Sequence, residues 1–372
     1  MEKVRLGDVA TYINGYAFKP TDWSNNGIPI IRIQDLTGNS YQLNRYRGNF
    51  DLKYEVNPGD VLISWSASLG IYVWEGERAV LNQHIFKVVF DKIEVNKNFF
   101  IHQAKNILEK AASEAHGATM KHLTKPVFDA LPFYLPAITE QERIARELNK
   151  VTDLIIKRKE QLEKLDELVK ARFVELFGDI NINDKNWDTQ PLGELCTIVR
   201  GGSPRPIEQF LGGDMPWIKI SDATDGDSVY LNSTKEHIIQ EGVKKSRLVK
   251  AGSLIFANCG VSLGFARIIT FDGCIHDGWL AMEGIDKRLD KVFLLQALNQ
   301  MTEHFRAIAP AGTQPNLNTA IMKAYKQIIP PLELQREYIE FCKQTDKSKF
   351  EIKQSLEKLE LLKKALMQKY FG

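Results

Sequence analysis

The feature that most constrains this chain of 372 residues is an internal duplication. The segment Leu6–Asp8 returns as Leu192–Glu194, and Ile28–Asp35 returns as Met215–Asp222 with the same order of Pro, Ile, basic residue, Ile and Asp. Through the second half of each copy the offset stays at 194 positions, and both copies end in Phe-Gly. A repeat of this length predicts two similar folded units. The two copies comprise residues 1–178 and 179–372.

The first part of each copy consists of short apolar runs separated by turns. Runs such as Val61–Ser66 and Ile85–Phe90 are rich in β-branched and aromatic residues, and Asn-Gly, Pro-Gly, Gly-Gly and Asp-Gly pairs punctuate the chain between such runs. This pattern is typical of strands joined by tight turns. It predicts an α/β or α+β globule at residues 1–138 and a second one at 179–332.

The second part of each copy, residues 139–178 and 333–372, has the composition of a long helix. Both segments lack Pro, contain Gly only as the last residue, and are rich in Glu, Lys, Leu and Gln. Apolar residues recur in steps of four and three, which predicts a heptad seam. The seam residues are Leu148, Val151, Ile155, Leu162, Leu165 and Val169 in the first segment and Ile352, Leu356, Leu359 and Leu366 in the second.

The order of the parts along the chain predicts how the helices pair. Because the order is globule, helix, globule, helix, two helices that pair in antiparallel fashion would carry one globule at each end of a coiled coil, with an approximate two-fold internal symmetry. Helices that pack separately on their own globules are the alternative.

Charge and targeting signals narrow the partners and the compartment only slightly. Lys and Arg total 49 and Asp and Glu total 47, so any nucleic-acid surface must come from local arrangement. No uncharged stretch approaches the roughly 20 apolar residues that a membrane span needs, and the first residues contain no apolar signal segment. A cytoplasmic protein without membrane contact is therefore expected.

Motifs that mark catalysis or metal binding are absent from the sequence. It contains no GxxxxGK[ST], GxGxxG, GxSxG or HExxH motif, and no Asn-Pro-Pro-aromatic motif of amino-methyltransferases. The four cysteines form no CxxC pair, and the seven histidines are scattered, so we expect reduced thiols, no metal site and no catalytic residue in this chain.

Several paired segments carry a resemblance to a known family. They are Leu6–Asp8 with Leu192–Glu194, Pro58–Leu62, Gly117–Leu123 with Gly312–Asn318, and Pro136–Ala145 with Pro330–Gln335. In this order, and over essentially the whole chain, they resemble the specificity subunit of type I restriction-modification systems.

The resemblance implies a function and a set of partners. Two target-recognition domains would each read one half of a bipartite sequence in double-stranded DNA, and the coiled coil would act as a ruler between them. Two methyltransferase subunits would methylate adenine N6 with S-adenosylmethionine, and restriction subunits would use ATP and Mg²⁺ for translocation and cleavage. This chain itself would hold no cofactor, and it would act at the nucleoid of a prokaryotic cell.

Candidate DNA-binding residues are basic, amide or histidine side chains in the two globules. In the first globule they are Lys19, Arg45, Arg47, Lys53, Lys121, His122 and Lys125, and in the second Arg205, Lys244, Lys245, Arg247, Lys250, Gln314, Asn316 and Asn318. Gln83, His84, His276 and Asp277 occupy equivalent repeat positions beside strands and are either base readers or turn residues. For Arg32 and Lys219, a salt bridge to the Asp three residues later is the first interpretation.

Two other classes of function stay open at this point. One is a coiled-coil adaptor whose globules bind protein, and the other is a DNA-modifying enzyme with unrecognised motifs. A gel shift with candidate partners would test the first, and a cofactor-binding assay would test the second.

Overall fold

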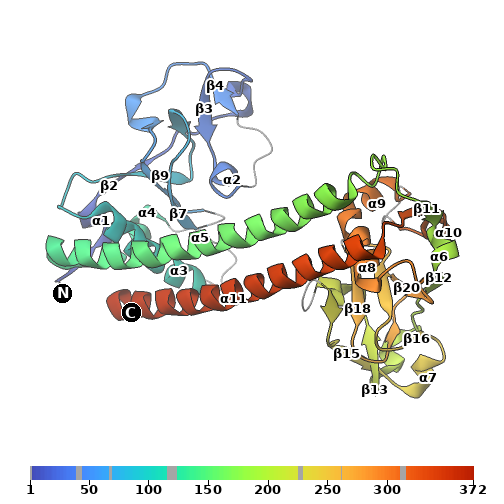
Figure 1. The fold of residues 1–372 in the computed structure, drawn as a ribbon. Helices are drawn as coiled ribbons and strands as arrows, with labels where there is room; N and C mark the ends of the chain where they lie inside the picture. Colours follow the sequence, from blue (N-terminus) through green and yellow to red (C-terminus); the bar gives the residue numbers. More distant parts are fainter. Residues whose placement is uncertain are drawn as a thin grey trace. The chain divides into compact units, whose positions relative to one another are not determined.

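The computed structural model describes residues 2–38, 44–66, 69–114, 124–224, 229–260, 262–310 and 316–372. It divides into two compact units (Figure 1). Unit 1 comprises Met1–Lys159 and Gln354–Gly372, and unit 2 comprises Glu160–Lys353. The two long helices are α5 (Ile138–Phe177) and α11 (Leu332–Phe371), drawn in green and red in Figure 1. Each helix begins and ends one residue earlier than the sequence predicts, and each contributes to both units.

In its described residues, the globule of unit 1 contains two four-stranded sheets, one two-stranded sheet and helices of 3 to 18 residues. The first sheet has the order β2 (Thr11–Asn14), β9 (Ile85–Val89), β6 (Val61–Ser64), β7 (Gly70–Val73). The second has the order β4 (Arg45–Tyr46), β3 (Ile28–Ile31), β8 (Ala79–Leu81), β5 (Glu55–Val56). Strands β1 (Glu2–Arg5) and β10 (Pro132–Leu135) pair separately, and the helices are α1 (Leu6–Val9), α2 (Ile33–Leu36), α3 (Lys97–Glu114) and α4 (Lys125–Asp129).

The globule of unit 2 repeats this arrangement with one more strand, Tyr230–Leu231, at the edge of its first sheet. Its first sheet has the order β12 (Thr197–Arg200), β20 (Trp279–Glu283), β17 (Leu254–Ala257), β18 (Ala266–Ile269), β14 (Tyr230–Leu231). Its second has the order β15 (Glu236–Ile238), β13 (Leu211–Ile218), β19 (Gly273–Ile275), β16 (Arg247–Val249). Strands β11 (Thr189–Pro191) and β21 (Lys326–Ile328) pair separately, and the helices are α6 (Leu192–Leu195), α7 (Gln240–Val243), α8 (Lys291–Gln300), α9 (Thr302–Ile308) and α10 (Thr319–Ala324).

The strand pairing confirms that the duplication extends to the fold. Strands β3 and β8 pair in parallel in unit 1, and β13 and β19 do so in unit 2, while the other strand pairs within both four-stranded sheets of unit 1 are antiparallel. A glycine follows β2 in unit 1 and β12 in unit 2, and its backbone touches the second sheet of the same unit. A Cβ atom on Gly15 or Gly201 would lie 2.1 Å from the main-chain oxygen of Asn82 or His276. Only glycine allows this approach, which brings the loop after β2 or β12 beside the turn that precedes β9 or β20.

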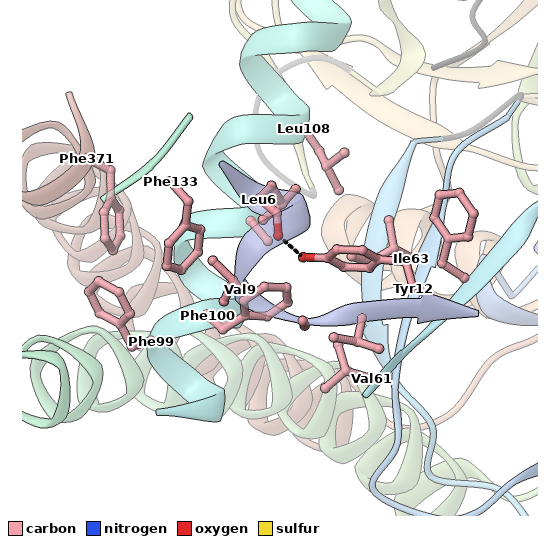
Figure 2. Packing of buried hydrophobic residues seen from close by; sticks show 14 of the residues in the cluster. Leu6, Val9, Tyr12, Val61, Ile63, Phe99, Phe100, Leu108, Phe133 and Phe371 are labelled. Atoms are coloured by element: carbon pink, nitrogen blue, oxygen red, sulfur yellow. Dashed lines mark hydrogen bonds between the residues drawn. The ribbon is translucent and has the colours of Figure 1, made fainter. Parts of the chain in front are cut away.

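The core of unit 1 joins the first sheet to the helices (Figure 2). Tyr12 of β2 is buried, and its hydroxyl donates to the main-chain oxygen of Leu6 at 2.9 Å. The ring of Phe371, at the end of α11, packs 5.6 Å from that of Phe99 in α3, next to Phe133. The end of α11 is therefore part of the globule's core.

A buried glutamine fixes the start of each long helix. The side chain of Gln141 accepts from the main-chain nitrogen of Asn96 at 2.9 Å and donates to the oxygen of Pro136 at 2.8 Å. Gln335 accepts from Asp290 at 2.8 Å and donates to Pro330 at 2.7 Å. Both side-chain amides are buried, and both form their hydrogen bonds within the protein. These two glutamines therefore act as clamps between the long helix and the globule.

Within each unit the segments of α5 and α11 run antiparallel. In unit 1, Arg143 contacts the hydroxyl of Tyr370, and Lys159 lies 3.6 Å from Glu360. In unit 2, Asp166 lies 2.6 Å from Lys349, and the main-chain oxygen of Val169 accepts from Tyr338 at 3.4 Å. All ten predicted seam residues are buried or half-buried. The predicted fold class, duplicated mixed α/β globules with two long antiparallel helices, is thus confirmed. In the described part of the chain, no helix combines the length and apolarity needed to cross a membrane.

Candidate nucleic-acid interface

In unit 2, the loop that follows β12 brings distant candidate residues together. The Ser246 hydroxyl donates to the main-chain oxygen of Gly202 at 2.7 Å, which places the basic stretch around Ser246 beside this loop. The Ser203 hydroxyl donates to the carboxylate of Asp277 at 2.8 Å, and the Arg205 guanidinium lies 3.6 Å from the same carboxylate. Lys244, Lys245, Arg247, Arg205 and His276 therefore flank one loop surface.

The same surface continues to the segment after β17. Asn258 connects this segment to two others. Its main-chain nitrogen donates to the oxygen of Gly278 at 2.9 Å, and its side-chain amide donates to the side-chain oxygen of Asn316 at 3.2 Å. Cys259, which is half-buried, forms a β-bridge with Asn316. Asn318 lies close by in sequence, but its side chain accepts from Ile321 at 2.9 Å and so caps α10.

Three of the candidate cations in unit 2 lack carboxylate partners. Among the described residues, no Asp or Glu oxygen lies within ion-pair distance of Lys244, Lys245 or Arg247, although the Lys245 ammonium lies 4.5 Å from the ring centre of Phe210. Lys250 differs, because it pairs with Asp272 at 2.7 Å. Unpaired cations are the ones whose charge a phosphate group can use.

The polar centre of this surface is the pair His276 and Asp277. His276 Nε2 lies 3.0 Å from an Asp277 oxygen, and Nδ1 accepts from the main-chain nitrogen of Gly278 at 2.9 Å. Burial lowers the pKa of His276, against the opposing effect of Asp277. Burial also opposes the charged form of Asp277, but the Ser203 hydroxyl and the nearby cations outweigh it, so the pKa of this carboxyl lies below its ordinary value. Because Nδ1 accepts from Gly278, the ring proton lies on Nε2, which faces the Asp277 carboxylate.

Unit 1 places other side chains at the equivalent positions. Asn14 and Gln83 occupy the places of Arg200 and Asp277, and His84 that of Gly278. The Trp65 indole nitrogen donates to the Asn14 side-chain oxygen at 3.1 Å. The Trp65 ring lies 5.0 Å from that of His84.

His84 itself has an unusual conformation. Its φ is +73°, a region that residues with a side chain rarely adopt, and its Nδ1 is buried without a hydrogen-bond partner in the described structure. Strain of this kind is most often found at functional sites.

The remaining candidates of unit 1 fall into two groups. Lys125 lies near the Trp65 surface, because its ammonium is 5.9 Å from the Phe86 ring on which Trp65 stacks, but it also pairs with Asp129 at 2.7 Å. The other group lies on or next to the second sheet and consists of Lys19, Arg45, Arg47 and Lys53. Within it Arg45 pairs with Glu77 and Lys53 with Asp51, whereas Lys19 and Arg47 have no ion pair among the described residues. Lys121, His122 and Gln314 lie outside the described residues.

The two local salt bridges predicted from sequence have different outcomes. Arg32 lies 3.3 Å from Asp35, as expected. The prediction for Lys219 is wrong: its ammonium pairs with Glu236 at 2.5 Å, and the Asp222 carboxylate accepts instead from the Lys219 main-chain nitrogen and the Thr234 hydroxyl, each at 2.8 Å.

Sequence reasoning missed four residues that complete these surfaces. They are Asn14 and Trp65 in unit 1 and Arg200 and Ser203 in unit 2. A signal was present for two of them, since Asn14 and Arg200 directly precede the matched glycines Gly15 and Gly201. No sequence signal marks Trp65, because its contact with Asn14 joins residues 51 positions apart.

Two similar globules, each with a polar loop surface of its own chemistry, define a protein with two recognition modules. A family model described as the type I restriction modification DNA specificity domain matches residues 1–166 and 184–363. The chain therefore belongs to this family, as a specificity subunit with one target recognition domain in each unit. The predicted family resemblance is confirmed.

Individual relatives agree with this assignment. The EcoBI specificity subunit of Escherichia coli is 30% identical over 171 residues, which cover 45% of this chain and 36% of that protein. The MjaVIII specificity subunit of Methanocaldococcus jannaschii is 22% identical over a match that covers 98% of this chain and 91% of that protein.

Solved structures share the fold over the whole chain. One match is a chain from a structural study of complex assembly and conformational transition in a type I restriction-modification system. It has a TM-score of 0.63 and 17% identity, and the match covers 100% of this chain and 97% of that chain. The S subunit from M. genitalium matches with a TM-score of 0.58 and 16% identity, covering 100% and 96%.

Proposed function

We propose that this chain is the DNA-reading component of a type I restriction-modification complex and recognises a bipartite target. The globule of unit 1 reads one half-site and that of unit 2 reads the other. The observation that supports this proposal is the pair of equivalent loop surfaces, which share a backbone but differ in side-chain chemistry: Asn14 and Gln83 in unit 1 correspond to Arg200 and Asp277 in unit 2. Amide and guanidinium groups are the side chains that distinguish bases in the major groove.

Unpaired cations beside the loop surface of unit 2 and next to the second sheet of unit 1 supply the affinity. Lys244, Lys245 and Arg247 in unit 2 and Lys19 and Arg47 in unit 1 are suited to phosphate contacts that hold the duplex in register. Since the formal net charge of the chain is only +2, DNA binding depends on such local clusters.

The partner subunits carry the chemistry in this proposal. Two methyltransferase subunits flip the target adenine out of the duplex and methylate N6 with S-adenosylmethionine, and restriction subunits use ATP and Mg²⁺. This chain is non-catalytic, holds no cofactor and acts in the prokaryotic cytoplasm at the nucleoid. Exposed apolar residues on the long helices support the docking of partner helices along α5 and α11. These are Leu154 and Leu361 in unit 1 and Val174 and Phe350 in unit 2, the last 60% exposed.

Mapping of adenine methylation tests the function directly. DNA is sequenced by a single-molecule method from cells that carry the complete system, with the gene intact and with it deleted. We expect a two-part motif with a fixed gap to vanish on deletion. Unchanged methylation in cells that express all subunits would contradict the proposal.

The cysteines offer a test of the proposed surface. Cys259 is half-buried beside Asn316, whereas the other three cysteines are buried. Burial raises the pKa of Cys259, so alkylation should be followed at mildly alkaline pH. In the complex with its methyltransferase, we expect target DNA to slow modification of Cys259 more than an equal amount of DNA without the target. Equal rates with and without target DNA would place the duplex elsewhere on unit 2.

A further inference from the structure

Arg200 is the last residue of β12, and Asn14 is its counterpart at the end of β2. Each precedes a glycine whose backbone is locked against the other sheet, as described above for Gly15 and Gly201. Both side chains are exposed. The two positions therefore share a rigid strand end and differ in the exposed side chain, which is an amide in unit 1 and a guanidinium in unit 2.

The Arg200 guanidinium is held at one end and open at the other. Its Nε donates to the main-chain oxygen of Asp277 at 2.9 Å. In the described part of the chain, no hydrogen bond or ion pair occupies either of its terminal nitrogens. Two coplanar N–H groups at a fixed position match the two acceptors, O6 and N7, that guanine presents in the major groove.

Asp277 is itself anchored from several sides. One carboxylate oxygen accepts from Ser203 at 2.8 Å and lies 3.0 Å from His276 Nε2, and the main-chain nitrogen of Asp277 donates to the Ser203 hydroxyl at 3.3 Å. Arg205, whose side chain is 80% exposed, approaches the other oxygen. The exposed Arg205 pair stabilises the fold little, whereas the hydrogen bonds between Ser203 and Asp277 hold the segment whose main-chain oxygen accepts from Arg200.

Among the described residues of unit 1, no equivalent of this network is present on the same backbone. Gln83 occupies the place of Asp277, and the Asn14 oxygen accepts from the Trp65 indole. A residue pair needed for folding would be retained in both copies, as the glutamine clamps Gln141 and Gln335 are. The difference points instead to the ligand that each surface contacts.

We propose that Arg200 reads a guanine in the half-site of unit 2 and that Asp277 is its positioning residue. This inference rests on the proposed function and adds a base identity to it: the half-site of unit 2 contains a G·C pair that Arg200 specifies through N7 and O6. The half-site of unit 1 is read at the equivalent position by the amide of Asn14.

A panel of target duplexes tests this assignment. The full chain in complex with its methyltransferase is bound to the wild-type target and to duplexes in which each base pair is replaced in turn. The variants are Arg200→Gln, Asp277→Ala, Asn14→Ala and, as a matched control that also removes one positive charge, Lys244→Gln.

We expect Arg200→Gln to lose discrimination at a single G·C pair, by roughly 5- to 100-fold, while the ratios among the other duplexes stay unchanged. Asp277→Ala should relax the same pair to a smaller extent, and Asn14→Ala should relax a pair in the other half-site. Lys244→Gln should weaken binding to every duplex by one common factor, because a phosphate contact carries no base information.

Three outcomes would overturn the inference. One is uniform weakening by Arg200→Gln, as for the control. Another is a half-site for unit 2 without a G·C pair. The third is loss of all binding by Arg200→Gln at an unchanged unfolding temperature, since one base contact does not account for the whole affinity. If the wild-type complex showed no half-site at all, the proposed function itself would fail, which is a different result.

Discussion

The salt dependence of DNA binding should change when the unpaired cations of unit 2 are removed. We consider the triple variant Lys244→Ala, Lys245→Ala, Arg247→Ala. None of these side chains has a carboxylate partner among the described residues, so each can release one counterion from the DNA on binding. Their removal should leave the sheets intact, because Lys244 and Lys245 follow α7 in a turn and Arg247 begins an edge strand with its side chain exposed.

The magnitude follows from the counterion count. Each phosphate contact adds about 0.9 to the slope of log affinity against log salt concentration, so three contacts add about 2.7. Between about 50 and 200 mM monovalent salt, the wild-type complex should therefore weaken about 40-fold more than the triple variant. Sequence preference should stay the same.

The assay is equilibrium binding of a labelled target duplex at four or more salt concentrations, with the chain in its methyltransferase complex. Lys250→Ala is the matched control, because Lys250 already pairs with Asp272 at 2.7 Å and should change the slope by less than one contact. An unchanged slope in the triple variant would remove this cluster from the interface. A slope that changed as much for Lys250→Ala as for each unpaired cation would refute the reasoning from ion pairs.

Three further expectations concern the scaffold. Gln335→Ala should lower the free energy of unfolding by about 1–3 kcal/mol, because the half-buried main-chain nitrogen of Asp290 loses the buried amide oxygen that it donates to; denaturant unfolding measures this, and a loss below about 0.5 kcal/mol would contradict the clamp. Burial lowers the pKa of His102 below its ordinary 6.5, so the unfolded chain binds this proton more readily and stability should fall as the pH drops from about 6.5 through the folded-state pKa. His102→Gln should flatten that part of the stability profile. Insertion of one heptad into each long helix should change the gap in the methylated motif but not its half-sites, and an unchanged gap would rule out the ruler.

The sequence predicted the elements that depend on periodicity and composition. The heptad positions from Leu148 to Leu366 lie on the buried sides of α5 and α11, because steps of four and three place apolar residues along one narrow stripe of each helix. The duplication predicted two globules of one topology without any knowledge of that topology. These features follow from local spacing, which a sequence displays directly.

The state of each charged side chain depended on contacts between distant residues. Arg45 and Lys250 looked as available as Arg47 and Lys244, but Glu77 and Asp272 pair with the first two across 32 and 22 positions. Asn318 illustrates the opposite case. An Asn that directly precedes a short helical run indicates an N-cap, and Asn318 caps α10 in this way.

The duplication also explains how such a chain can change its target without losing its fold. Positions whose packing joins the parts are retained in both copies, such as Gln141 with Gln335 and Gly15 with Gly201, because an altered internal contact costs stability directly. The exposed strand ends Asn14 and Arg200 carry no such constraint, since surface substitutions outside special contacts change stability by only about 0.5 kcal/mol. Selection for a new half-site can therefore act on these positions while the clamps and the helices keep the scaffold unchanged.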